Sequence, residues 1–166
     1  MPVSAPSQPL GIRPDIHLSA EQTEMVRFLD GYDLWFVKER LLRKDRMPAE
    51  RLDRAVLEFR RYMSLIGLGY RGLGMLSPEV DDVWHDFILF TREYAEFCQT
   101  AFGTFIHHVP RTSRTPRTDA GREAFLTAYT EVFGVAAVEA YAVATGFERS
   151  MGDEPSGCGT EDCTGG

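Results

Sequence analysis

The chain has 166 residues, of which 43% are hydrophobic and 26% charged, a composition typical of a folded globular domain and unlike that of disordered, collagenous or membrane proteins. Its 18 Lys and Arg against 25 Asp and Glu give a formal charge of −7, which disfavours DNA binding by the surface as a whole. The length indicates one domain with a flexible segment at each end and leaves no room for a second catalytic domain.

The cysteines are few and odd in number. Cys98, Cys158 and Cys163 do not form the disulfide framework of a small secreted domain. The N-terminal residues have neither the basic nor the apolar region of a signal peptide, and no apolar stretch is long enough to span a membrane. We therefore expect a cytoplasmic protein that does not enter a membrane. Residues 147–166 are acidic and contain Gly and Cys, and we expect them to form a flexible tail that captures metal weakly or not at all.

The first predicted helix follows a proline-rich segment. Residues 1–18 contain four prolines and are predicted to form a disordered arm, because they offer little apolar surface to bury. Ser19, with Gln22 three residues later, has the pattern of a capping box. The apolar residues that follow recur every three or four positions, which predicts one helix to about Lys44.

Four further helices are predicted along the rest of the chain. Pro48 suits the first turn of a helix over about 48–66. Residues 67–74 are rich in glycine and match G-x-G-x-x-G, but no strand precedes them, so no nucleotide cofactor is expected. Further helices are predicted over 77–102, 119–133 and 135–144, which gives an all-α fold, an irregular bundle of four to five helices within residues 19–146.

The residues best suited to a functional site lie between Asp81 and His108. Asp81 and His85 are four residues apart on one helix face, and His107 and His108 follow the end of that helix. If that segment folds back, these residues would form a nitrogen and oxygen site that suits zinc or non-haem iron, with Glu58 and Cys98 as possible additional residues. The alternatives are an ordinary acid–histidine pair on a helix surface and histidines that cap the helix end. For Glu58 the rim of the fold is favoured over a buried position.

Two other groups of residues have functional interpretations. Cys98 lies on the apolar stripe of its helix and is interpreted as a buried core residue, although a neighbouring base would make it a nucleophile. Arg111, Arg114 and Arg117 recur every three residues and would line one side of an extended segment, where they could bind an anion or a partner. We call residues 111–117 the arginine loop, and a solvated loop without a ligand is the favoured reading.

A family resemblance rests on this same region. Residues 80–85, Val-Asp-Asp-Val-Trp-His, together with Tyr94, Cys98 and the sequence His-His-Val-Pro at 107–110, resemble the bacterial form of the glycine-rich domain-containing protein-like family over about residues 50–135. The resemblance names relatives without naming a reaction, and it favours a site around His85. Plant relatives are associated with RNA binding but carry segments that this chain lacks, so RNA is a disfavoured partner.

Three functional hypotheses follow. The first is a metal-binding helical protein, which could be a small metalloenzyme that acts on an unidentified small molecule. Iron or zinc would be held by His85, His107 and His108, and Asp81 would be a further ligand or would orient the histidines. The second is a non-catalytic module that binds a protein or RNA through the arginine loop or the acidic tail. A nucleophilic Cys98 is a third reading, and it predicts rapid alkylation of the native protein.

Overall fold

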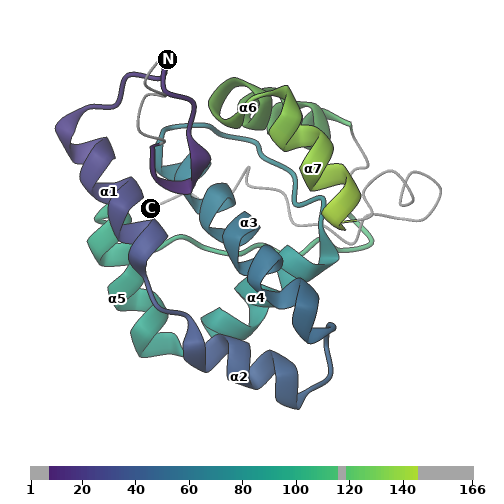
Figure 1. Cartoon of the computed structure of the whole chain (residues 1–166). Helices are drawn as coiled ribbons and strands as arrows, with labels where there is room; N and C mark the ends of the chain where they lie inside the picture. The colour runs from purple at the N-terminus through teal and green to yellow at the C-terminus, as the bar shows by residue number, and fades with distance from the viewer. Residues whose placement is uncertain (1–7, 116–118, 146–166) are drawn as a thin grey trace.

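The structure, a computed structural model, describes residues 8–115 and 119–145, and within them it contains helices and no strand (Figure 1). The predicted all-α class is therefore correct for the described residues, but they form seven α-helices instead of four or five. A short 3-10 helix η1 (Pro9–Gly11) precedes them. The α-helices are α1 (Ala20–Gly31), α2 (Trp35–Arg43), α3 (Ala49–Gly67), α4 (Pro78–Ile88), α5 (Thr91–Phe102), α6 (Ala120–Phe133) and α7 (Val135–Thr145).

The predicted helix from residue 19 to 44 is divided into α1 and α2. It begins as expected, because the capping box at Ser19 is present. Tyr32 then takes an extended conformation. The side chain of Asp33 accepts a hydrogen bond from the backbone N–H of Trp35 at 3.0 Å, and the carbonyl of Tyr32 accepts one from the Arg60 guanidinium at 2.6 Å. These side chains replace the backbone bonds that a continuous helix would have made.

The predicted helix over 77–102 is also divided, at Leu89 and Phe90, into α4 and α5. Phe90 leaves the helical region of backbone conformation, with φ −85° and ψ 69°. Its ring packs on that of Phe36 in α2 at 4.8 Å, while Leu89 remains 57% exposed. The break packs the partly buried Phe90 against the core and turns α5 across α1. Helix α5 ends as predicted at Gly103, which has a φ of 68°.

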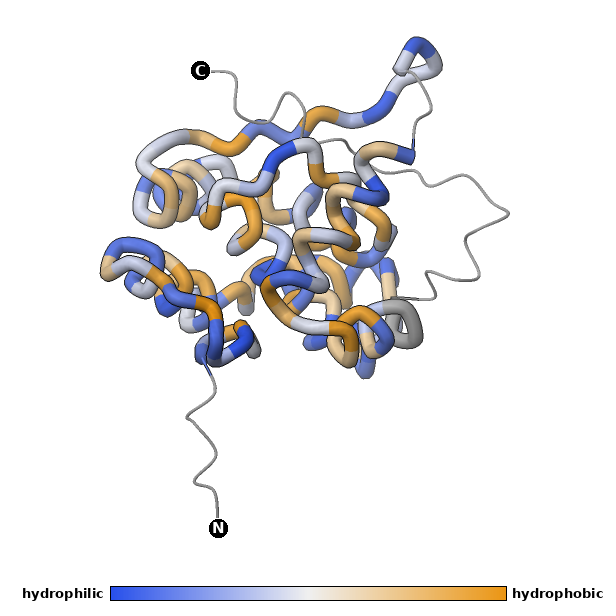
Figure 2. Tube along the Cα trace, turned by 90° about the horizontal axis from the view of Figure 1, so that it is seen from above, coloured by the Kyte–Doolittle hydropathy of each residue, from blue (hydrophilic) through white to orange (hydrophobic). Residues whose placement is uncertain are grey.

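The core is organised around α3, which contacts α1, α4, α6, α7 and η1 and lies in the middle of the fold (Figure 1). Hydrophobic residues alternate with hydrophilic ones around the helices (Figure 2). The largest fully buried side chains are aromatic and come from α3 to α6; they are Trp84, Tyr62, Tyr94, Tyr129, Phe59, Phe87, Phe97 and Phe125. None of the helices in the described residues is long and apolar enough to cross a membrane.

Part of the predicted disordered arm has a defined place in the fold. Residues 8–18 include η1, and the side chains of Leu10 and Ile12 are buried in the core at 5% and 1% exposure. The prediction of a disordered arm is therefore wrong for residues 8–18, because Leu10 and Ile12 bury apolar surface that the prolines do not. Residues 1–7 and the predicted tail 147–166 lie outside the described residues.

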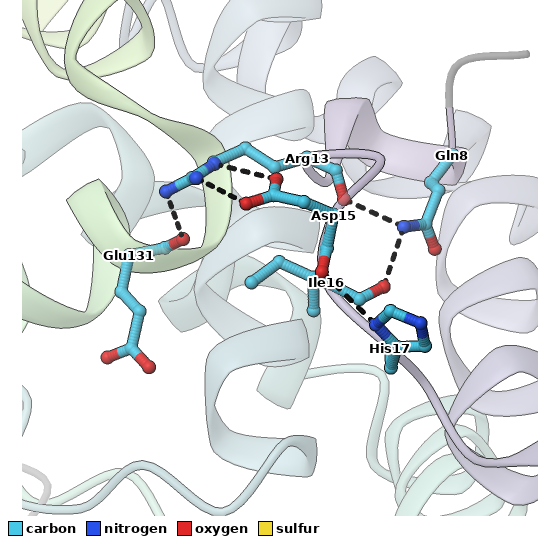
Figure 3. Close-up of polar contacts among 6 residues, drawn as sticks. All are labelled: Gln8, Arg13, Asp15, Ile16, His17 and Glu131. Atoms are coloured by element: carbon cyan, nitrogen blue, oxygen red, sulfur yellow. Dashed lines mark hydrogen bonds and ion pairs between the residues drawn. The ribbon is translucent and has the colours of Figure 1, made fainter. Parts of the chain in front are cut away.

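Hydrogen bonds fix this N-terminal segment to α6 (Figure 3). The Gln8 side-chain amide donates to the carbonyls of Arg13 and Ile16 at 2.7 and 2.9 Å. The backbone N–H of Arg13 donates to the carbonyl of Val132 at 2.9 Å, and its guanidinium donates to the carbonyl of Glu131 at 3.3 Å. The segment therefore connects the start of the described chain to the end of α6.

Candidate metal centre

Helix α4 supplies two of the candidate ligands. Its first turn is fixed by Ser77, whose hydroxyl accepts a hydrogen bond from the backbone N–H of Val80 at 3.3 Å. Asp81 and His85 then lie one turn apart, with 3.5 Å between Asp81 Oδ2 and His85 Nδ1. The Asp81 side chain is 11% exposed and that of His85 47% exposed. The pair lies at the surface, with the carboxylate on its inner side.

The third candidate ligand comes from the segment after α5. His108 Nε2 lies 2.9 Å from Asp81 Oδ1, on the carboxylate oxygen opposite to the one that faces His85. The His108 side chain is only 3% exposed. Its ring packs edge-on against Trp84, with 4.4 Å between centroids, and lies 4.3 Å from the His85 ring. The three side chains therefore converge on one point, and we call Asp81, His85 and His108 the Asp–His–His cluster.

A buried hydrogen-bond chain positions the segment that carries His108. The indole N–H of Trp84 donates to the hydroxyl of Tyr94 at 2.9 Å, and that hydroxyl donates to the carbonyl of Ile106 at 2.6 Å. Trp84, Tyr94 and Ile106 are all buried. The chain links α4, α5 and the following segment two residues before His108, so it fixes the distance between His108 and α4.

His107 does not join its neighbour. Its side chain is exposed, and its ring contacts Phe105 at 4.9 Å. Among the described residues, the histidine, cysteine and acidic side chains whose ligand atoms approach closely enough for one ion are Asp81, His85 and His108, all within 4.8 Å of one another. The four-residue ligand set expected from sequence is reduced to these three.

The spacing of the cluster is compatible with one metal ion, because one ligand atom from each residue lies within 4.8 Å of the others. Ligand atoms around a tetrahedral zinc ion lie about 3.3 Å apart, given metal–ligand bonds of about 2.0–2.1 Å. The distances from Asp81, 2.9 Å from Oδ1 to His108 and 3.5 Å from Oδ2 to His85, lie on either side of that value, and the shorter one is a hydrogen bond between the two side chains. Two imidazole nitrogens and one carboxylate oxygen are donors that zinc and iron(II) both accept.

A pocket of about 450 Å³ adjoins the cluster and is lined by both of its histidines. The remaining lining residues come from the α2–α3 connection, from α4 and its C-terminal end, and from the segment after His108; they are Lys44, Arg46, Asp82, Asp86, Ile88, Leu89 and Pro110. Burial raises the pKa of Asp82 above its usual value, and the nearby Arg46 guanidinium opposes that shift. The basic residues of this wall were not among the sequence candidates, since they lie some 40 positions before the cluster.

Glu58 belongs to a different cluster and is not at the rim as predicted. Its side chain is fully buried, with Arg54 Nη2 at 2.8 Å, Arg61 Nη1 at 3.2 Å and the Tyr129 hydroxyl at 2.7 Å. Two guanidinium groups and one hydroxyl offset the cost of burying the carboxylate. Arg61 also donates to the carbonyl of Leu10 at 2.9 Å, so this network connects η1, α3 and α6.

The remaining candidates are spread over other parts of the fold. Cys98 is buried, which raises the pKa of its thiol, and the hydrogen-bonding groups beside its sulfur are the Ile106 backbone and Tyr94. In the arginine loop, the backbone N–H of Thr112 donates to the Thr115 hydroxyl at 2.9 Å. That turn replaces the extended run that would have aligned the arginines, and the last of them, Arg117, lies outside the described residues.

Comparison with known proteins identifies the family. A family model described as UCP032817-like matches residues 24–130, which include the whole Asp–His–His cluster. The chain belongs to the UCP032817-like family. The resemblance to the glycine-rich domain-containing protein-like family is therefore wrong, because the matching model describes a different family. No curated protein and no solved structure matches the chain.

Proposed function

We propose that this protein binds one divalent transition-metal ion, zinc or iron(II), through Asp81, His85 and His108. The observation that carries the proposal is the convergence of these side chains from two segments, with Asp81 and His108 separated by 27 positions in the chain and 2.9 Å in space. Asp81 bridges both histidines, and the nearly buried His108 is held by packing on Trp84.

Three protein ligands favour a metal centre that takes part in chemistry. Structural zinc sites are closed by four protein ligands, whereas catalytic sites have three and leave a position for water or substrate. The pocket supports this reading, because His85 and His108 contribute to its wall. A metal bound there would act as a Lewis acid and lower the pKa of a coordinated water. We therefore propose a small metalloenzyme over a purely structural metal site.

The test is the metal content and metal affinity of the full-length, untagged chain. The protein tested also carries the substitutions Cys158→Ser and Cys163→Ser, so that these two thiolates do not contribute to metal binding. Zinc and iron are measured by elemental analysis after purification, and zinc affinity is measured by competition with a chelating dye. We expect about one ion per chain, with circular dichroism confirming that each variant is folded.

Histidine variants provide a matched comparison. His108→Ala and His85→Ala remove ligands, and each is expected to weaken zinc binding by at least about tenfold. His107→Ala removes the adjacent, exposed histidine and is expected to leave zinc affinity unchanged. Equal affinities in all three variants would refute the proposed site. A chain without metal that also fails to take up zinc would favour the non-catalytic interaction module.

A further inference from the structure

The pocket beside the Asp–His–His cluster has two unlike walls. Lys44 at the end of α2 and Arg46 after it provide a basic wall, while Ile88, Leu89 and Pro110 provide an apolar one. Leu89 is 57% exposed, although large hydrophobic side chains in this fold are mostly buried. A ligand that uses both walls needs an anionic group and an apolar part.

The charges around the pocket would compensate a metal ion bound in the cluster only in part. Both oxygens of the buried Asp86 face cations, with Lys44 Nζ and Arg40 Nε each at 3.4 Å. Arg46 attracts Asp82 but makes no ion pair with any residue in the described ranges.

In the pocket wall Lys44 and Arg46 balance Asp82 and Asp86, so a divalent ion beside the cluster's own Asp81 would leave one positive charge without a counter-charge. A bound cation is often the largest local charge in its site, and an anion at its open position would reduce that excess.

From these observations we infer that the pocket binds a small organic carboxylate, whose anionic group coordinates the metal within reach of Arg46 and whose apolar part lies against Leu89. This inference rests on the proposed metal site. The apolar wall is the reason for choosing an alkyl or aryl carboxylate over inorganic phosphate. A volume of about 450 Å³ lies within the range of small-molecule sites.

The experiment measures anion binding to the zinc-loaded full-length protein by isothermal titration calorimetry. The probes are acetate, hexanoate and inorganic phosphate, and the zinc content of every sample is measured beforehand. Hexanoate is expected to bind about tenfold more tightly than acetate, because burying part of its chain removes several methylene groups from water. It is also expected to bind more tightly than phosphate, and its affinity is expected to fall when zinc is removed.

Single variants measure the contribution of each wall to carboxylate binding. Arg46→Gln is expected to weaken the binding of both carboxylates several-fold without changing zinc content. Leu89→Asn is expected to weaken hexanoate and leave acetate unchanged. Arg92→Gln, at an exposed position of α5 that does not line the pocket, is the control and should behave as the parent protein.

The outcomes distinguish this inference from the metal site itself. Zinc binding without carboxylate binding overturns the inference and leaves the proposed function intact. An Arg46→Gln variant with full affinity, hexanoate no tighter than acetate, or phosphate tighter than hexanoate would each overturn the assignment of the ligand. A protein that takes up no zinc overturns both.

Discussion

Replacing Glu58 by glutamine removes the charge from a carboxylate whose side chain is completely buried. Glutamine retains one oxygen, which can still accept a hydrogen bond from the Tyr129 hydroxyl. It loses the charge-assisted contacts with Arg61 at 3.2 Å and Arg54 at 2.8 Å, and its amide donors would face those guanidiniums. Charge-assisted hydrogen bonds contribute about 1.5–3 kcal/mol each, and breaking a buried pair costs about 3–5 kcal/mol.

The expected loss is at the low end of that range. Arg54 makes an ion pair with Glu58 but no hydrogen bond, whereas Arg61, whose side chain is only 12% exposed, donates one hydrogen bond to it, so the variant loses one charge-assisted hydrogen bond. We expect Glu58→Gln to lower the free energy of unfolding by about 3 kcal/mol, equivalent to about 6–12 °C in Tm for a chain of this size. Urea denaturation and calorimetry measure both quantities.

A matched control separates the buried network from a general effect of charge removal. Glu24 is exposed on α1, and Glu24→Gln is expected to change stability by no more than about 0.5 kcal/mol. A Glu58→Gln variant within about 1 kcal/mol of the parent protein would refute the reasoning, because it would mean that the two arginines do not depend on the carboxylate.

Three further predictions concern packing, positioning and reactivity. Gly74→Ala should destabilise the fold by about 1–3 kcal/mol in urea denaturation, because its added Cβ would lie 2.9 Å from the backbone of Gly121, whereas Gly31→Ala has open space and should not destabilise it. Tyr94→Phe should weaken zinc affinity several-fold although no ligand is changed, because the carbonyl of the segment before His108 loses its donor; unchanged affinity in the folded variant would contradict this positioning role. With serine at the two other cysteines, Cys98 should react with iodoacetamide only on unfolding, because burial raises its thiol pKa and lowers the thiolate fraction at neutral pH; rapid alkylation of the native protein would show otherwise.

Local signals in the sequence predicted most helix ends. The Ser19 capping box, the helix over 48–66 and the stop at Gly134 appear in the structure within a residue or so. Each depends on contacts between residues a few positions apart, which the sequence displays directly. The two helix breaks were missed, since the apolar periodicity continues across them and the compensating contacts come from distant residues such as Arg60 and Phe36.

The candidate site also has one part that local spacing predicts and one part that tertiary contacts decide. The pairing of Asp81 with His85 follows from four-residue spacing on one helix. The sequence could not choose between His107 and His108, because adjacent side chains point in different directions and the tertiary contacts of Tyr94 decide which one faces α4.

Burial of charged groups also depended on tertiary structure. Arg54 and Arg61 are one turn from Glu58 and could be identified as its partners from sequence, but Tyr129 is 71 positions away. The sequence by itself determined the all-α class, most helix ends and one pair of site residues, because these depend on local spacing. The tertiary structure decided the third ligand, the pocket and the buried Glu58 network, because each requires side chains that only packing of distant helices brings together.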